Sequence, residues 1–297
     1  MPEPKLSDDE WPPVWRGERS MVPPSLIDGA VAALRAEDLD RKVSLTRATA
    51  RAWADRRLGL GRAVGVQVPE RPGRPANPRL VAPGAVPRRS LHTARGRIAL
   101  LHAIAHIELN AMDLAWDIVA RFADHRSGAE GRPMPRSFYD GWVRVAYEEA
   151  KHFSLLRHRL KAMGSDYGEL DAHDGLWEAS RSTAHALSAR LAVVPLILEA
   201  RGLDVTPALI GKVRATGDEE SAAIFETIYR DEQGHVAVGA KWFRFLCLRD
   251  GVEPAAAFRE LVRRHFRGSV KPPFNELARA RAGLTPGFYR TLSSAGT

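Results

Sequence analysis

Two acid–histidine pairs in this sequence could bind metal ions. Each has the form Glu-x-x-His: Glu149 precedes His152 by three residues, and Glu232 precedes His235 by the same spacing. In a helix this spacing places the carboxylate and the imidazole on one face, about one turn apart. Both pairs lie in long segments with helical periodicity, so we expect each pair to present an oxygen and a nitrogen in the same direction.

A single glutamate in each of two other apolar helical segments extends this pattern. With Glu108 and Glu199 included, the order along the chain is Glu, Glu-x-x-His, Glu, Glu-x-x-His. This order is the ligand set of a carboxylate-bridged di-metal site inside a four-helix bundle. We therefore predict six metal ligands: Glu108, Glu149, His152, Glu199, Glu232 and His235.

The neighbours of these glutamates predict that their carboxylates face a core. Around Glu108 a helix would place Leu101, Ile104 and Met112 on the same apolar stripe, and the other three glutamates have similar surroundings. Burying an ionised carboxylate is costly unless a cation compensates it. A salt bridge to arginine or lysine could compensate any single glutamate. Four glutamates with two histidines at matched spacing favour a shared metal site.

The composition is typical of a soluble protein. The chain has 297 residues, 44% of them hydrophobic, which is enough for a core. Its longest apolar run, residues 191–198, contains Pro195 and is shorter than the roughly 20 residues that span a bilayer. The N-terminus has no apolar signal segment, and the single cysteine, Cys247, argues against disulfides and thiolate metal sites. We expect a cytoplasmic protein with no membrane partner.

The net charge of +8 allows three interpretations: binding to nucleic acid, binding to an acidic cofactor or partner, or the arginine bias of a GC-rich genome. The basic residues are scattered along the chain, with small clusters at Arg263–Arg264 and at residues 279–281. Genome bias is the favoured explanation, and nucleic acid is the alternative partner.

Periodicity and breakers predict an all-α protein in three regions. Residues 1–89 comprise an irregular arm, one or two flanking helices over about 25–58 and a loop rich in proline and glycine. Residues 90–250 form the bundle. Residues 251–297 form a C-terminal helix and a tail. Four core helices are expected at about 90–123, 136–163, 176–201 and 218–248.

Three details of the bundle region follow from its turn residues and prolines. Residues 166–175 are polar and predict the longer crossover between two helix pairs. Pro195 removes the helical hydrogen bond to Leu191, so the third core helix should kink or widen there. Thr206-Pro207 is expected to begin a separate short helix that ends near Ala215. No alternation is long enough to build a sheet.

The stretches His106-Ile-Glu-Leu-Asn and Arg230-Asp-Glu-Gln-Gly-His235 resemble the ferritin-like superfamily, in particular an uncharacterised bacterial ferritin-like branch of unknown function. The resemblance covers about residues 90–250 and extends, more distantly, to the tRNA-modifying di-iron hydroxylase. It implies a ferritin-like four-helix bundle with a long crossover and extra flanking helices. It also implies two iron ions, or alternatively two manganese or mixed manganese and iron, with Glu149 and Glu232 as bridges.

In many of these relatives an acid directly before the ligating glutamate orients a metal-bound histidine. Asp231 fits this place, and Glu148 is the matching residue of the other pair. Because Glu148 has Arg144 and Lys151 as stripe neighbours, we predict Glu149 and not Glu148 as the ligand.

The function implied is an O₂-activating oxidoreductase, a hydroxylase or oxidase, acting on an unknown small molecule with electrons from an external donor. Alternatives are non-catalytic or ferroxidase-type iron binding, peroxide removal at two manganese ions, and hydroxylation of a modified tRNA base. A homodimer is compatible with this reading, whereas the long terminal additions argue against assembly into a ferritin cage.

Overall fold

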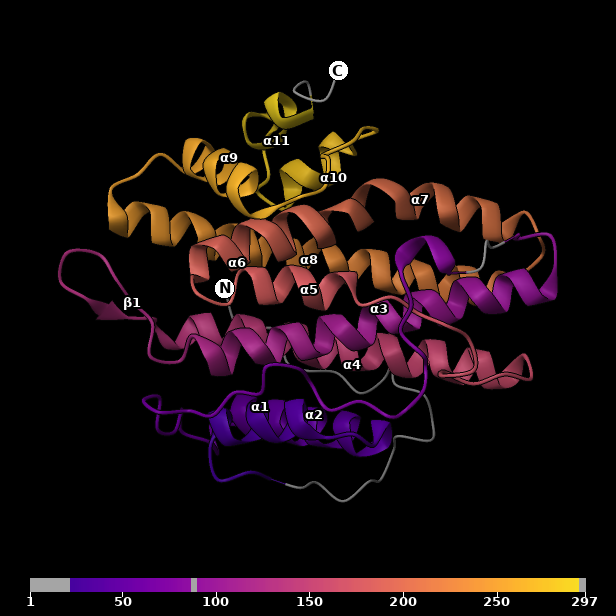
Figure 1. Ribbon diagram of the computed structural model, residues 1–297, viewed down its shortest axis with the longest axis horizontal. Coiled ribbons are helices and arrows are strands. Elements are labelled where there is room, and N and C mark those ends of the chain that lie inside the picture. Colours follow the sequence, from indigo (N-terminus) through magenta and orange to yellow (C-terminus); the bar gives the residue numbers. More distant parts are fainter. Residues whose placement is uncertain (1–21, 87–89, 294–297) are drawn as a thin grey trace. The chain divides into compact units, whose positions relative to one another are not determined.

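The computed structural model describes residues 22–86 and 90–293, and their regular structure is mostly helical (Figure 1). The predicted all-α class is confirmed. Most of the predicted N-terminal arm lies outside the described residues. The chain forms two compact units: residues up to 124 together with 135–177 make the first, and residues 125–134 together with 178 onward make the second.

The first unit is built on a pair of long helices, with a second pair packed against it (Figure 1). Helix α3 packs along α4, α1 packs on α2 and α3, and α2 also packs on α4. The described residues of the predicted long loop between α2 and α3 include the short 3₁₀ turn η2 (Pro83–Ala85), and Leu80 makes an isolated β-bridge with Ala172. The helices are α1 (Leu26–Arg35), α2 (Leu39–Ala54), α3 (Ala94–Arg121) and α4 (Arg136–Ala162).

Side-chain caps fix where α1, α2 and α3 begin. Ser25 Oγ accepts the Asp28 N–H at the start of α1, and Thr93 Oγ1 accepts the Gly96 N–H at the start of α3. Among the described residues α3 is the one helix long and apolar enough to cross a membrane. Because 72% of its most apolar window is buried inside the protein, we treat α3 as a core helix.

A buried ionic network attaches the long loop to α3. Asp113 of α3 accepts hydrogen bonds from Lys42 of α2 at 2.7 Å and from Arg74 of the loop at 2.7 Å. Arg74 also donates to Asn110 Oδ1 at 3.0 Å. Lys42 and Asp113 are fully buried, so two cations and several donors stabilise one carboxylate away from water.

The second unit packs α7, α6 and the segment η3 against the long helix α8, with three short helices outside them (Figure 1). Asp218 caps the start of α8, and Gly251 ends it in the left-handed conformation, with φ of 68°. A two-residue pairing of β1 (Arg126–Ser127) with β2 (Arg132–Pro133) makes a small antiparallel hairpin. The helices are α6 (Leu187–Val193), η3 (Val194–Glu199), α7 (Ala200–Arg214), α8 (Glu219–Asp250), α9 (Pro254–His265), α10 (Glu276–Arg281) and α11 (Pro286–Ser293).

The prediction of one helix over residues 176–201 is wrong. Helix α5 (Gly175–Ser182) ends, a turn follows, and α6 begins at Leu187. The hydroxyls of Ser182 and Thr183 both donate to Ala179 O, at 2.8 and 3.0 Å, and Arg190 Nη2 donates to Ser180 O at 2.8 Å. Side chains therefore take up carbonyls that a continuing helix would have used.

The prediction of a separate helix starting at Thr206 is also wrong, because α7 continues through Pro207 to Arg214. Proline cannot donate the helical hydrogen bond to the carbonyl four residues earlier, which here is Leu203 O. Asn275 Nδ2 donates to Leu203 O instead, at 3.2 Å. Asn275, from the C-terminal segment, thus replaces the hydrogen bond that Pro207 cannot donate.

The predicted distortion at Pro195 is confirmed. Residues Val194–Glu199 form the π-helical segment η3, in which the Ala200 N–H donates to Pro195 O. The ring of Pro195 packs against Gly239 of α8, where a Cβ atom would lie 2.6 Å from Pro195 Cβ. Glycine at 239 therefore allows η3 to approach α8 closely.

Candidate metal centre

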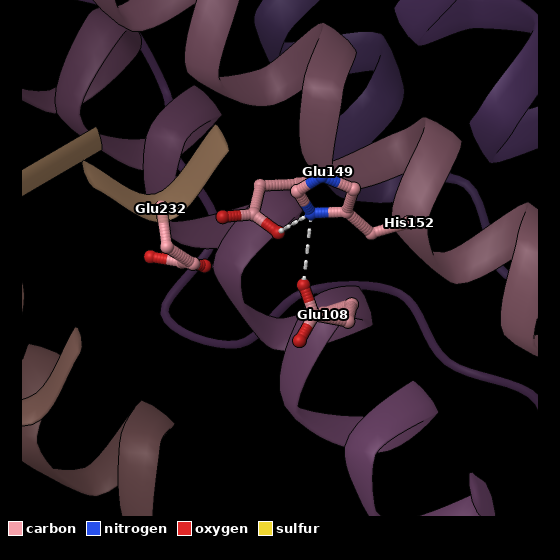
Figure 2. A group of neighbouring side chains, drawn as sticks. All are labelled: Glu108, Glu149, His152 and Glu232. Atoms are coloured by element: carbon pink, nitrogen blue, oxygen red, sulfur yellow. Dashed lines mark hydrogen bonds and ion pairs between the residues drawn. The ribbon is translucent and has the colours of Figure 1, made fainter. Parts of the chain in front are cut away.

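Three of the predicted ligands meet in the first unit. Glu108 comes from α3, and Glu149 and His152 come from α4; Figure 2 shows the three side chains turned toward one another. His152 Nδ1 lies 3.1 Å from Glu108 Oε2 and 3.3 Å from Glu149 Oε2. One ligand atom from each residue lies within 4.8 Å of the others, a spacing that a metal ion could bridge. We call these residues the first set.

The first set is removed from water. Glu149 and His152 are fully buried, and Glu108 is 3% exposed. Burial raises the pKa of Glu108 well above its ordinary value, and the nearby negative charge of Glu149 raises it further, although the hydrogen bond from His152 opposes this. Two carboxylates in one dry site repel each other, so a cation between them would restore the balance of charge.

The ring orientation of His152 is suitable for a metal ligand. Nδ1 is the nitrogen that faces both carboxylates, and in the metal-free protein it can donate its proton to only one oxygen at a time. A metal ion at this position would take the place of that proton. Binding would therefore release protons and depend on pH.

The other three predicted ligands lie in the second unit, and we call them the second set: Glu199, Glu232 and His235. Glu199 is the last residue of η3, and Glu232 and His235 lie on α8, which packs against η3. His235 Nδ1 is 3.6 Å from Glu232 Oε1, so this Glu-x-x-His pair also turns Nδ1 toward its carboxylate. The His235 side chain is 1% exposed, that of Glu232 is 13% exposed, and Glu199 is half-buried.

The two acids predicted to orient histidines both contact a neighbouring arginine. Arg144 Nε donates to Glu148 Oε1 at 2.8 Å on α4, and Arg230 Nε donates to Asp231 Oδ1 at 3.2 Å on α8. Their side chains are 13% and 10% exposed. Each acid therefore has a cation as its neighbour on the same helix.

Two further histidines on α3 hold the crossover in place. His106 Nε2–H donates to His173 O at 3.1 Å, so its Nδ1 accepts the hydroxyl proton of Tyr167, at 2.7 Å. His102 Nε2 accepts the Gly168 N–H at 2.9 Å. We call the hydrogen bonds that join His102 and His106 to the crossover the histidine clasp. Burial, together with the positive charge of Arg74, lowers the pKa of His106 to about 3, so His106 takes part in the clasp as a neutral ring.

The clasp formed by His102 and His106 was not anticipated from the sequence. Their spacing of four residues was visible. Tyr167 and His173, however, lie more than 60 residues further along, in a crossover without periodicity.

Comparison with known proteins identifies the family of this chain, and the description of that family names no activity. The family described as "Protein of unknown function (DUF455)" matches residues 35–290. A protein from Haemophilus influenzae described as "Uncharacterized protein" is 43% identical over 211 residues, which cover 71% of this chain and 73% of that protein. No solved structure matches the chain. The chain therefore belongs to the DUF455 family.

Proposed function

We propose that this protein binds two iron ions and uses them to activate O₂ as an oxidoreductase. The observation that carries the proposal is the group formed by Glu108, Glu149 and His152, in which two carboxylates and an imidazole share a buried site. Such a group is costly in the absence of a cation, because each charge has lost its water. Burying these groups costs less free energy when they bind a metal ion than when they lie in a hydrophobic core without one.

The donor atoms favour iron or manganese. The proposed site offers carboxylate oxygens and imidazole nitrogens, and no thiolate. Mixed oxygen and nitrogen donors suit iron and manganese, whereas thiolates select softer metals and clusters. When bound, a pair of iron ions supplies the redox chemistry that reduces O₂.

The proposal requires the first and second sets to ligate the same two ions, with Glu149 and Glu232 as the bridging carboxylates. Each set offers a glutamate and a Glu-x-x-His pair on packed helical segments. In the proposal each set supplies half of the ligands of a ferritin-like four-helix bundle. Asp231 and Glu148 would orient the histidines. A small organic molecule is the proposed substrate, and an external protein or cofactor the proposed source of electrons.

The side chains have defined tasks in this proposal. The buried carboxylates hold the metals and exclude water, and Nδ1 of each histidine provides a neutral donor once its proton has left. Arg144 and Arg230 donate hydrogen bonds to the adjacent acids, Glu148 and Asp231. The histidine clasp on α3 fixes the crossover beside the helix that carries Glu108.

Metal analysis tests the proposal. We expect about two iron atoms per chain after anaerobic loading with ferrous iron, and consumption of O₂ when air is admitted. Glu149→Ala and Glu232→Ala should each lose the two-metal stoichiometry and keep a helical circular dichroism spectrum. Full metal retention in both variants would refute the ligand assignment.

The identity of the metal separates the alternatives. Two manganese ions with release of O₂ from peroxide would indicate peroxide removal. Iron oxidation with accumulation of a mineral would indicate storage, and a hydroxylated base in tRNA incubated with the loaded protein would indicate an RNA substrate.

A further inference from the structure

A short C-terminal segment, Asn275–Arg279, connects α7 to α8 inside the second unit. Asn275 caps α10 through its Oδ1, which accepts the Ala278 N–H at 3.2 Å. Its Nδ2 donates to Leu203 O of α7 at 3.2 Å and to Tyr229 Oη of α8 at 3.0 Å. One side-chain amide therefore joins two helices that carry or adjoin predicted ligands.

A buried ion pair holds this segment in place. Arg279 donates to Asp204 of α7 from Nε at 2.8 Å and from Nη2 at 2.7 Å, so the guanidinium engages the carboxylate with two parallel hydrogen bonds. The Asp204 side chain is fully buried, and Arg279 is 2% exposed. Asp204 Oδ1 also accepts the Asn275 N–H at 2.9 Å. Paired in this way away from water, the ions define one position of α10 on α7.

Both ends of the connection lie close to predicted ligands in the chain. Tyr229 precedes Glu232 by three residues, so its ring lies on the same side of α8, one turn away. Leu203 is one turn beyond Glu199, in the first turn of α7. Arg279 Nη2 also approaches Ala200 O, at 3.5 Å, and Ala200 directly follows Glu199.

The proline in α7 makes this connection necessary. Pro207 leaves Leu203 O without its helical donor, and Asn275 supplies the missing hydrogen bond. Without it, the first turns of α7 would have a weakened hydrogen-bond ladder directly after the π-helical segment that ends at Glu199.

We propose that Asn275 and Arg279 form a latch that fixes the position of Glu199 relative to Glu232 and thereby sets the geometry of the second set around its metal. The inference rests on the proposed di-metal function. Asn275 and Arg279 are positioning residues in this scheme: they act through α7 and α8 and touch no metal.

Two substitutions remove the latch contacts selectively. Asn275→Ser keeps a residue that caps helices well but is too short to reach Leu203 and Tyr229. Tyr229→Phe removes only the acceptor on α8. The matched control is Tyr289→Phe in α11, because the buried Tyr289 hydroxyl has no hydrogen-bond partner among the described residues.

The measurement is titration of the full chain with Mn²⁺, followed by electron paramagnetic resonance at a temperature where circular dichroism shows every variant fully folded. We expect Asn275→Ser and Tyr229→Phe to weaken the binding of one of two ions by about tenfold and to change the Mn²⁺ spectrum. Tyr289→Phe should match the wild type in both. A latch that only stabilised the fold would lower the unfolding temperature and leave affinity and spectrum unchanged.

Two outcomes would overturn the inference in distinguishable ways. If the wild type binds two ions and both latch variants retain its affinity and spectrum, the latch has no positioning role, and the proposed function stands. If the wild type binds neither Mn²⁺ nor Fe²⁺, the proposed function fails and the latch fails with it.

Discussion

Burial makes the charge of Glu108 expensive when no cation is present. We predict that Glu108→Gln, which keeps the size and an acceptor for His152, stabilises the metal-free protein at neutral pH by about 1–3 kcal/mol. The same variant should lose the stabilisation that metal confers on the wild type. Thermal unfolding in excess chelator, with and without subsequent metal, measures both effects. A metal-free variant less stable than the wild type would show that the Glu108–His152 contact itself stabilises the fold.

Metal affinity should increase with pH. Because the folded pKa of Glu108 is raised, its proton must leave before the carboxylate can bind a cation. Below that pKa, each decrease of one pH unit should weaken the apparent metal affinity by up to about tenfold for each proton that the metal displaces. Titrations with Mn²⁺ at several pH values, with Glu108→Gln for comparison, measure the slope. A pH-independent affinity would contradict the raised pKa.

His106 predicts an acid-sensitive fold. Its folded pKa of about 3 lies below the roughly 6.5 of an unfolded chain, so on acidification the unfolded state takes up the proton first. Stability present above the unfolded pKa is lost as pH falls toward the folded pKa, by roughly 3–5 kcal/mol in total. His106→Gln can make both clasp hydrogen bonds without titrating. Denaturant unfolding at several pH values between about 3 and 7 gives the slope of the free energy of unfolding against pH. In His106→Gln this slope should correspond to one fewer proton taken up on unfolding than in the wild type. An unchanged slope would refute the assignment.

The contact between η3 and α8 leaves no room for a side chain at position 239. We predict that Gly239→Ala costs about 1–3 kcal/mol, because the added Cβ would overlap the Pro195 ring. Gly211→Ala in α7 is the matched control: open space surrounds that position, so alanine should add about 0.5–1 kcal/mol of helix stability. Urea unfolding measures both. Equal effects of the two substitutions would show that η3 moves away without cost.

The attachment of the long loop to α3 depends on Asp113. Asp113→Asn would leave Lys42 and Arg74 without their shared carboxylate, and we predict a loss of about 3–5 kcal/mol. The control is Glu260→Gln, which breaks the exposed pair with Arg264 and should cost less than about 1 kcal/mol. Chemical unfolding compares the two variants, and a small loss for Asp113→Asn would mean that the loop finds other partners.

Local sequence predicted the helices whose signals are local. The apolar period and the flanking breakers placed α3, α4 and α8 to within a few residues. It failed where a distant side chain decides the outcome. Pro207 reads as a helix breaker until Asn275, almost 70 residues later, supplies the missing donor. The end of α5 likewise depends on hydroxyls and on Arg190, which is seven residues beyond Thr183.

The candidate site was predictable to the same extent. The spacing of Glu149 and His152 needs only a helix, and Glu108 was found from its apolar stripe, so their convergence followed from pairing two helices. The supporting contacts within each unit were not visible: Tyr167 contacts His106 in the first unit, Asn275 contacts Tyr229 in the second, and both pairs join segments remote in sequence.

At the scale of the whole molecule, metal removal should separate the unfolding of the two units. If both sets hold the same ions, metal at 1,000 times its dissociation constant adds about 4 kcal/mol to the free energy of unfolding. Scanning calorimetry should then show one transition with metal and two, at lower temperature, with chelator. Glu199→Gln should behave like the chelated protein. Identical thermograms with and without metal would contradict a shared centre.

The small β1–β2 hairpin has a consequence for ancestry. Residues 125–134 belong to the second unit although residues of the first unit flank them on both sides, and Gly128 and Ser127 bond to Asp250 and Arg249 at the end of α8. The polypeptide chain therefore passes from the first unit into the second, returns to the first, and then passes into the second unit again. Neither unit corresponds to one contiguous stretch of gene, so joining two half-genes end to end would not by itself reproduce this protein.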